Sequence, residues 1–365
     1  FFFKQKTAYE IPKRDWSSDV CSSDLVAVPS KQGWLYCFDR ITGVPIWPIE
    51  ERPVPQTTMK HEQTSPTQPF PTKPVPYART YIAESDLIDF TPELRKQALA
   101  NLKFFRWEPT PYVPPTGPES KLLGSINIGN TAGGTNWPGA GFDVETGIFY
   151  SQAGMTNVTV GHYSAEEFEK VTPENKGNRT PRWEAEPNYG MPRPAPAPGQ
   201  AAAPAINFPG GEGRRKLGEG LDGLPIVKPP YGVLAAIDLK NPDKLLFQVP
   251  HGDTPDKIKN HPLLKGLNIP KTGQSGSVGV MITKNFVASG DPGITTVNGQ
   301  RGASLRAYDK QTGAQLGEVR VPAPILGMPM TYSFQGRQYI VVGVSGGNYT
   351  GEYIAFRLPQ SELPR

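Results

Sequence analysis

The stretch Ser304–Val319, SLRAYDKQTGAQLGEV, places an apolar run, a tight turn and a second apolar run in immediate succession. Its centre has the form aromatic-Asp-x-x-Thr-Gly. The carboxylate of such an Asp can accept hydrogen bonds from turn amides, and the glycine can supply a positive φ. The stretch therefore predicts a β-hairpin whose turn is formed by Asp309 and Gly313.

The same turn recurs along the chain. Further copies are Phe38-Asp39-x-x-Thr42-Gly43, Phe142-Asp143-x-x-Thr146-Gly147 and, in degenerate form, Ile237-Asp238 followed by Asn241-Pro242. Each copy lies between apolar runs, and other β-rich runs such as VAVPS, NFVASG and YIVVGVSGG lie nearby. Hairpins repeated in this way are typical of antiparallel sheets arranged radially. We therefore predict an all-β fold, a partial β-propeller of about four blades.

The repeats lie further apart than the about 40–50 residues of an ordinary blade, so long insertions must separate them. One spans about 48–120 and is expected to contain a helix, because Thr91 can cap it and Pro92 can open it, with an end near Phe104. The other spans about 161–230 and is rich in Pro, Ala and Gly. We expect a helical insertion and long Pro/Gly-rich loops beside the sheets.

Residues 1–25, FFFKQKTAYEIPKRDWSSDVCSSDL, show neither helical nor strand periodicity. Their codons can be written so that they match an indexed sequencing adapter translated in one frame. We therefore expect 1–25 to be a non-native, adapter-derived stretch and 26–365 to be the propeller portion, beginning at about Val26.

Composition excludes several classes of function. The net charge of +4 is mild and scattered, which argues against nucleic acid as a partner. No run approaches the roughly 18 apolar residues of a membrane-spanning helix. Without the first 25 residues Cys37 is the one cysteine, and we expect it to be a small buried apolar side chain. No metal-ligand spacing, Walker loop or dinucleotide fingerprint is present, and the four histidines are expected in loops or at the surface: His61, His162, His251 and His261.

Two short motifs carry candidate chemistry. Lys31 lies in PSKQGWLYCFDRITGVPIW, Pro29–Trp47, and could present an ammonium group to a ligand or could be a solvated turn lysine before Gly33. The second motif is GGTNWP, Gly133–Pro138. Its paired glycines would let the backbone approach a flat ligand. Asn136 could hydrogen-bond the polar rim of that ligand, and Trp137 could line the cavity. The alternative is an ordinary glycine-rich turn with a buried Trp.

These motifs resemble segments of the pyrroloquinoline quinone-dependent dehydrogenases, the quinoprotein glucose and alcohol dehydrogenases. PPYGVLAAIDLK and GMPMTYSFQGRQYIVVGVSGG extend the resemblance through most of the chain after residue 25. It implies the C-terminal part of an eight-bladed propeller. It also implies that Lys31, Asn136 and Trp137 bind the quinone. One departure is Gln274-Ser275-Gly276-Ser277, where the alcohol dehydrogenases carry a Trp near the cofactor.

The resemblance also implies pyrroloquinoline quinone and Ca²⁺ as cofactors and an alcohol or sugar hydroxyl as substrate. A membrane quinone or a cytochrome would be the electron acceptor, and the location would be the periplasm or the outer face of the inner membrane. The family's catalytic Asp would fall at about Lys4, before Val26, and the calcium ligands would lie further upstream. No catalytic residue and no metal ligand can therefore be assigned, and this fragment alone is expected to be inactive.

A second hypothesis is a propeller that scaffolds protein partners without a cofactor, resembling outer-membrane assembly lipoproteins with similar repeats. Three features discriminate between the two hypotheses, because a plain scaffold has no need of them. These features are Lys31, the GGTNWP motif and the two long insertions.

Overall fold

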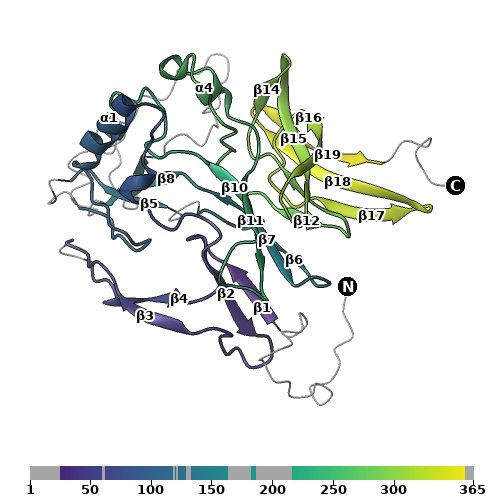
Figure 1. The fold of residues 1–365 in the computed structure, drawn as a ribbon, viewed down its shortest axis with the longest axis horizontal. Coiled ribbons are helices and arrows are strands. Elements are labelled where there is room, and N and C mark those ends of the chain that lie inside the picture. The colour runs from purple at the N-terminus through teal and green to yellow at the C-terminus, as the bar shows by residue number, and fades with distance from the viewer. Residues whose placement is uncertain are drawn as a thin grey trace, which may run out of the picture.

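Antiparallel β-sheets dominate the structure, a computed structural model that describes residues 25–59, 62–117, 120, 122–128, 133–162, 182–185 and 216–357 (Figure 1). Every strand pair among these residues is antiparallel, apart from one isolated parallel bridge between Arg106 and Ser125. The all-β prediction is confirmed. The expectation for residues 1–25 falls almost wholly outside the described residues.

Two sheets have the strand order of complete propeller blades. In the first, β6 (Gly141–Asp143), β7 (Ile148–Gly154), β10 (Gly232–Asp238) and β11 (Phe247–Pro250) lie in the order β11-β10-β7-β6. In the second, the same meander is made by β12 (Val280–Ile282), β13 (Phe286–Gly290), β15 (Gln300–Asp309) and β16 (Gln315–Val321), and β14 (Thr295–Val297) also pairs with β15. Strands adjacent in sequence and in space are what a propeller blade requires.

Smaller sheets flank these two. Near the start of the described chain β1 (Leu25–Pro29) pairs with β2 (Leu35–Asp39), and near its end β17 (Met330–Phe334), β18 (Arg337–Gly346) and β19 (Tyr349–Phe356) form a three-stranded sheet. Figure 1 shows these two sheets on opposite sides of the complete ones. The first insertion adds a ribbon, β3 (Ile49–Pro53) with β4 (Thr67–Pro71), and a sheet of β5 (Ser125–Ile128), β8 (Asn157–His162) and β9 (Arg182–Ala185) lies beside it. The fold is a partial β-propeller.

The predicted turns form as expected. The Asp309 carboxylate accepts hydrogen bonds from the amides of Gln311, at 3.0 Å, and Thr312, at 2.8 Å, and Gly313 has φ +71°. Asp39 does the same for its own turn, with the Thr42 amide at 2.6 Å. These bonds satisfy amides that the hairpin would otherwise leave without partners.

The four hairpins do not mark four separate sheets, however. Because β10 pairs with β7, Asp143 and Asp238 both lie opposite Ile148 in one sheet. The sheet β17–β19 lacks the Asp turn altogether, and its turns use Gln335-Gly336 and Gly347-Asn348 with positive φ instead. The turn motif therefore identifies hairpins but does not count blades.

The Asp turns of the two complete sheets lie side by side. Lys310, in the Asp309 turn, places its Nζ 2.5 Å from the carboxylate of Asp143, and the Tyr150 hydroxyl donates to the Lys310 carbonyl at 2.9 Å. We call this end of the sheets the turn edge. The opposite end is the loop edge, where the segments 30–34, 155–156, 251–279 and 291–294 follow β1, β7, β11 and β13.

The predicted helix is present as α1 (Pro92–Leu102), and the Thr91 hydroxyl accepts from the Leu94 amide at 3.2 Å. Its buried face packs against residues 217–227 of the second insertion, and the Asn101 amide donates to the carbonyls of Leu217 and Glu219. The two insertions thus share one core. Further short helices in the described part of the chain are η1 (Glu84–Asp86), α4 (Asp256–Lys259) and η3 (Pro262–Leu264).

Two smaller expectations can also be compared with the structure. Cys37 is buried in the core of β1 and β2, as predicted, and burial raises the pKa of its thiol to about 12. Among the described residues no helix is long and apolar enough to span a membrane.

Candidate functional site

The two motifs that were singled out in the sequence lie against each other at the loop edge. The Gly134 amide donates a hydrogen bond to the Lys31 carbonyl at 2.8 Å. A Cβ atom on Gly133, which has φ +80°, would lie 2.6 Å from Cγ of Lys31. A side chain at 133 would therefore displace Lys31, which explains why glycine is needed here.

The contact continues across the next sheet. The Gly154 amide, at the end of β7, donates to the Gly134 carbonyl at 2.7 Å. A Cβ atom on Gly154 would lie 2.9 Å from Oγ of Ser275, which follows β11. These close contacts form a continuous series in space, which we call the loop-edge row: Lys31, Gly134, Gly154 and Ser275. The row connects the loop that follows β1 with segments next to the four-stranded sheet of β6, β7, β10 and β11, and loops of neighbouring sheets form a shared binding face in a propeller.

The GGTNWP motif is anchored by its threonine. The Thr135 hydroxyl is buried and donates to the Gln152 carbonyl at 2.9 Å. The next residue, Asn136, accepts hydrogen bonds from the Trp137 amide and the Gly139 amide, both at 2.8 Å. Trp137 itself is 75% exposed, so the buried Trp that the alternative of an ordinary turn expected is not observed. The indole lies on the surface, where a ligand or another segment can reach it.

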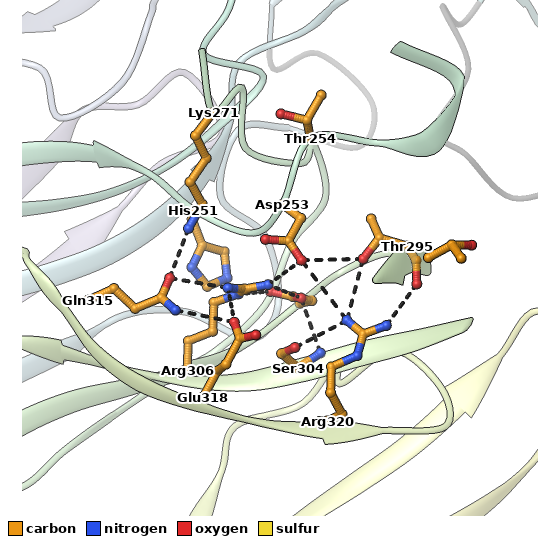
Figure 2. Close-up of polar contacts among 12 residues, drawn as sticks. His251, Asp253, Thr254, Lys271, Thr295, Ser304, Arg306, Gln315, Glu318 and Arg320 are labelled. Carbon is orange, nitrogen blue, oxygen red and sulfur yellow. Dashed lines mark hydrogen bonds and ion pairs between the residues drawn. The ribbon is translucent and has the colours of Figure 1, made fainter. Parts of the chain in front are cut away.

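A buried charge network supports the loop edge (Figure 2). Arg306 of β15 is 1% exposed and contacts three carboxylates: Asp291 with Nε at 2.6 Å, Asp253 with Nη2 at 2.8 Å, and Glu318. Asp291 is fully buried. Arg306 lies opposite Ser289 of β13 and Glu318 of β16 in the sheet register, so the network ties β15 to the loop that contains Asp253.

Two more cations complete the network. Nζ of Lys271 donates to the Gln315 amide oxygen at 2.8 Å, and partial burial together with the nearby Arg306 lowers the pKa of Lys271 below its usual value. Arg320 donates to the Thr295 carbonyl at 2.8 Å. Sequence reasoning missed this network. Its one signal was a charged residue in the middle of the apolar run SLRAY.

Two histidines lie in loops, as predicted, but neither is at the surface. His251 is fully buried, with Nδ1 2.9 Å from the Tyr308 hydroxyl and Nε2 2.8 Å from the Gly290 carbonyl. His261 is also buried, with Nε2 3.0 Å from the Asp222 carbonyl. Each ring bridges two segments, which no local pattern reveals. His162 belongs to β8, and His61 lies outside the described residues.

The burial of His251 predicts that the free energy of unfolding depends on pH. Burial lowers its pKa, and Arg306 and Lys271 add to this effect, while Asp291 and the Gly290 carbonyl oppose it. In the unfolded chain the ring titrates near about 6.5, so below that pH the unfolded state binds more protons than the folded state. The free energy of unfolding should therefore fall by up to about 1.4 kcal/mol per pH unit below pH ~6.5.

This expectation can be measured by urea denaturation of the wild type and of His251→Gln between pH 7.5 and 5. The difference between the two slopes isolates His251 from the other titrating groups. Parallel slopes would show that the ring does not titrate on unfolding.

Among the described residues, no group of three or more His, Cys, Asp or Glu side chains is arranged to hold a metal ion. The functional groups at the loop edge are an ammonium group at Lys31, an amide at Asn136, an indole at Trp137 and the hydroxyls of Thr156 and Ser275. The ammonium group, the amide and the indole fit a flat, anionic ligand that is bound at its rim by hydrogen bonds and by one positive charge.

Comparison with known proteins identifies relatives of this architecture. Residues 14–340 match the family described as glucose/ethanol/alcohol dehydrogenase, beta-propeller domain. A probable quinate dehydrogenase (quinone) of Xanthomonas campestris pv. juglandis is 28% identical over 98% of this chain and 41% of its own length. The quinoprotein glucose dehydrogenase of Gluconobacter oxydans is 27% identical over 97% of this chain and 42% of its own length.

Among solved structures, the quinohemoprotein alcohol dehydrogenase of Comamonas testosteroni is similar, with a TM-score of 0.42 and 17% identity over 88% of this chain and 32% of that one. The chain thus spans about two fifths of the length of the curated relatives that it matches.

Proposed function

The chain belongs to the β-propeller family of glucose, ethanol and alcohol dehydrogenases, and from this premise we propose that the protein carrying it oxidises an alcohol or sugar hydroxyl with pyrroloquinoline quinone. One observation carries the proposal. Lys31 and the GGTNWP motif, far apart in the sequence, meet through the 2.8 Å hydrogen bond from Gly134 to Lys31. A quinone site that used both motifs would require the two motifs to lie in contact.

In this proposal Lys31, Asn136 and Trp137 hold one side of the quinone. The Lys31 ammonium stabilises negative charge at the quinone oxygens, Asn136 bonds the polar rim, and the Trp137 indole covers a ring face. Bound pyrroloquinoline quinone supplies the two-electron acceptor for alcohol oxidation. The exposure of Trp137 supports this role, because a buried indole could not reach a ligand.

The remaining parts of the proposal rest on the family. Ca²⁺ would accompany the quinone. Its ligands and a catalytic Asp would be supplied by the native residues that precede Val26 in the full-length protein, in place of the adapter-derived stretch. A membrane quinone or a cytochrome would receive the electrons, and the protein would work in the periplasm or on the outer face of the inner membrane. The relatives named above are quinone-dependent dehydrogenases, which supports this class of reaction.

Activity of the full-length protein tests the proposal. The purified protein is incubated with pyrroloquinoline quinone and Ca²⁺, and reduction of an artificial electron-accepting dye is followed with a panel of alcohols and sugars. We expect dye reduction that needs both the quinone and a hydroxyl substrate. A folded protein that reduces no dye with any substrate would contradict the proposed function.

A further inference from the structure

A pair of side-chain hydroxyls lies at the end of the loop-edge row. Oγ1 of Thr156, two residues past Gly154, is 2.9 Å from Oγ of Ser275. Thr156 is 9% exposed and Ser275 is half-buried. The pair therefore lies next to the close approach of Gly154 to Ser275, at the opposite end of the loop-edge row from Lys31.

The pair has hydrogen-bonding capacity that no other described residue uses. Two hydroxyls carry two protons, and the bond between them uses one. Neither hydroxyl makes another hydrogen bond within the part of the chain that the structure describes. One proton and several lone pairs remain, so the pair suits a partner that both donates and accepts. An alcohol hydroxyl is such a partner, whereas a carboxylate or a quinone oxygen only accepts.

The residues on either side of Ser275 fix its position. The amide of the preceding residue, Gln274, donates to the His251 carbonyl at 2.8 Å, and the His251 ring is itself fixed by Tyr308 and Gly290. On the other side, a Cβ atom on Gly276 would lie 2.5 Å from Cβ of Pro292. Pro292 follows Asp291, which forms an ion pair with the buried Arg306. A hydroxyl fixed in this way loses little entropy when it binds a ligand.

We propose that Thr156 and Ser275 form a specificity-determining hydroxyl pair that bonds a second hydroxyl group of the substrate. The inference rests on the proposed function and narrows its substrate class to molecules with more than one hydroxyl. Lys31 and the GGTNWP motif serve the quinone, and the hydroxyl pair at the other end of the row serves the substrate.

The test compares variants of the full-length protein that each lose one hydroxyl: Ser275→Ala, Thr156→Val and the double variant. The substrates are glycerol and 1-propanol, which have the same number of carbon atoms, together with a sugar. Loss of a neutral hydrogen bond should lower kcat/KM for glycerol and the sugar by about 3- to 10-fold, largely through KM, with 1-propanol unchanged. The double variant should lose about as much as either single variant, because the hydroxyls act as a unit.

Two controls separate contact with the substrate from other roles. Thr331→Val removes an exposed threonine hydroxyl of β17 and should leave kcat/KM unchanged for glycerol, 1-propanol and the sugar. Quinone affinity, measured by quenching of tryptophan fluorescence, should be the same in the wild type and in all of these variants.

The outcomes are distinguishable. Equal losses for all substrates, no loss at all, or a wild type that prefers 1-propanol overturns the hydroxyl pair while leaving the proposed function intact. Weakened quinone binding in Ser275→Ala would assign the pair to the cofactor instead, and it also overturns the inference. A wild type that neither binds quinone nor oxidises any of the substrates overturns the proposed function and this inference with it.

Discussion

Replacing Arg306 by methionine should lower the free energy of unfolding by about 3–5 kcal/mol, since it leaves Asp291 buried without its cation. Asp291 is fully buried, and the one other donor to its carboxylate among the residues that the structure describes is the Ser304 amide at 3.1 Å. Asp253 and Glu318 lose the same partner. Urea denaturation of the wild type and the variant measures the effect.

A matched control is Arg52→Met, which removes an arginine from an ion pair with Glu50 whose two side chains are 49% and 53% exposed. That loss should be below about 1 kcal/mol, because water already screens the pair. The double variant Arg306→Met/Asp291→Leu should recover part of the loss, since it no longer buries an unpaired charge. If Arg306→Met costs no more than Arg52→Met, the network does not stabilise the loop edge.

Replacing Lys31 by alanine in the full-length protein should reduce turnover by about 10²- to 10³-fold, the usual effect of losing one preorganised charge at a reacting group. Stability should change by less than about 1 kcal/mol, because Lys31 is only half-buried and alanine keeps the backbone carbonyl that accepts from the Gly134 amide. Dye reduction under saturating quinone and substrate gives the turnover, and thermal melts give the stability.

Lys31→Arg keeps the positive charge and should retain more activity than Lys31→Ala. Lys284→Ala, in the exposed turn between β12 and β13, is the control for loss of a lysine and should leave turnover unchanged. Turnover of Lys31→Ala within a few-fold of the wild type would remove Lys31 from the site.

Local features of the fold could be predicted because their physics is local. The Asp309 turn depends on hydrogen bonds within four residues, and the α1 helix begins with a threonine cap and a proline that follow each other in the sequence. Pairing of β10 with β7 could not be predicted in the same way, because 88 residues separate Ile237 from its strand partner Phe149 and strand partners are chosen by tertiary packing.

Only part of the candidate site could be predicted from the sequence, for the same reason. Lys31, Asn136 and Trp137 were found through resemblance to a family, and the structure adds the contact between their two segments. The burial of His251 and the Arg306 network depend on loops that meet only in the folded chain, so a lone histidine and a strand arginine gave no usable pattern. The Thr156–Ser275 pair likewise joins two segments far apart in sequence.

The central claim, that this family member uses the quinone at the loop edge, is tested most directly by equilibrium binding. The full-length protein, with Ca²⁺ present, is titrated with pyrroloquinoline quinone while its tryptophan fluorescence is recorded. We expect saturable binding with a micromolar or tighter Kd, weakened at least about tenfold, or by 1.4 kcal/mol, in Lys31→Ala. A folded wild type that shows no saturable binding would contradict the account and favour a propeller that scaffolds partners without a cofactor.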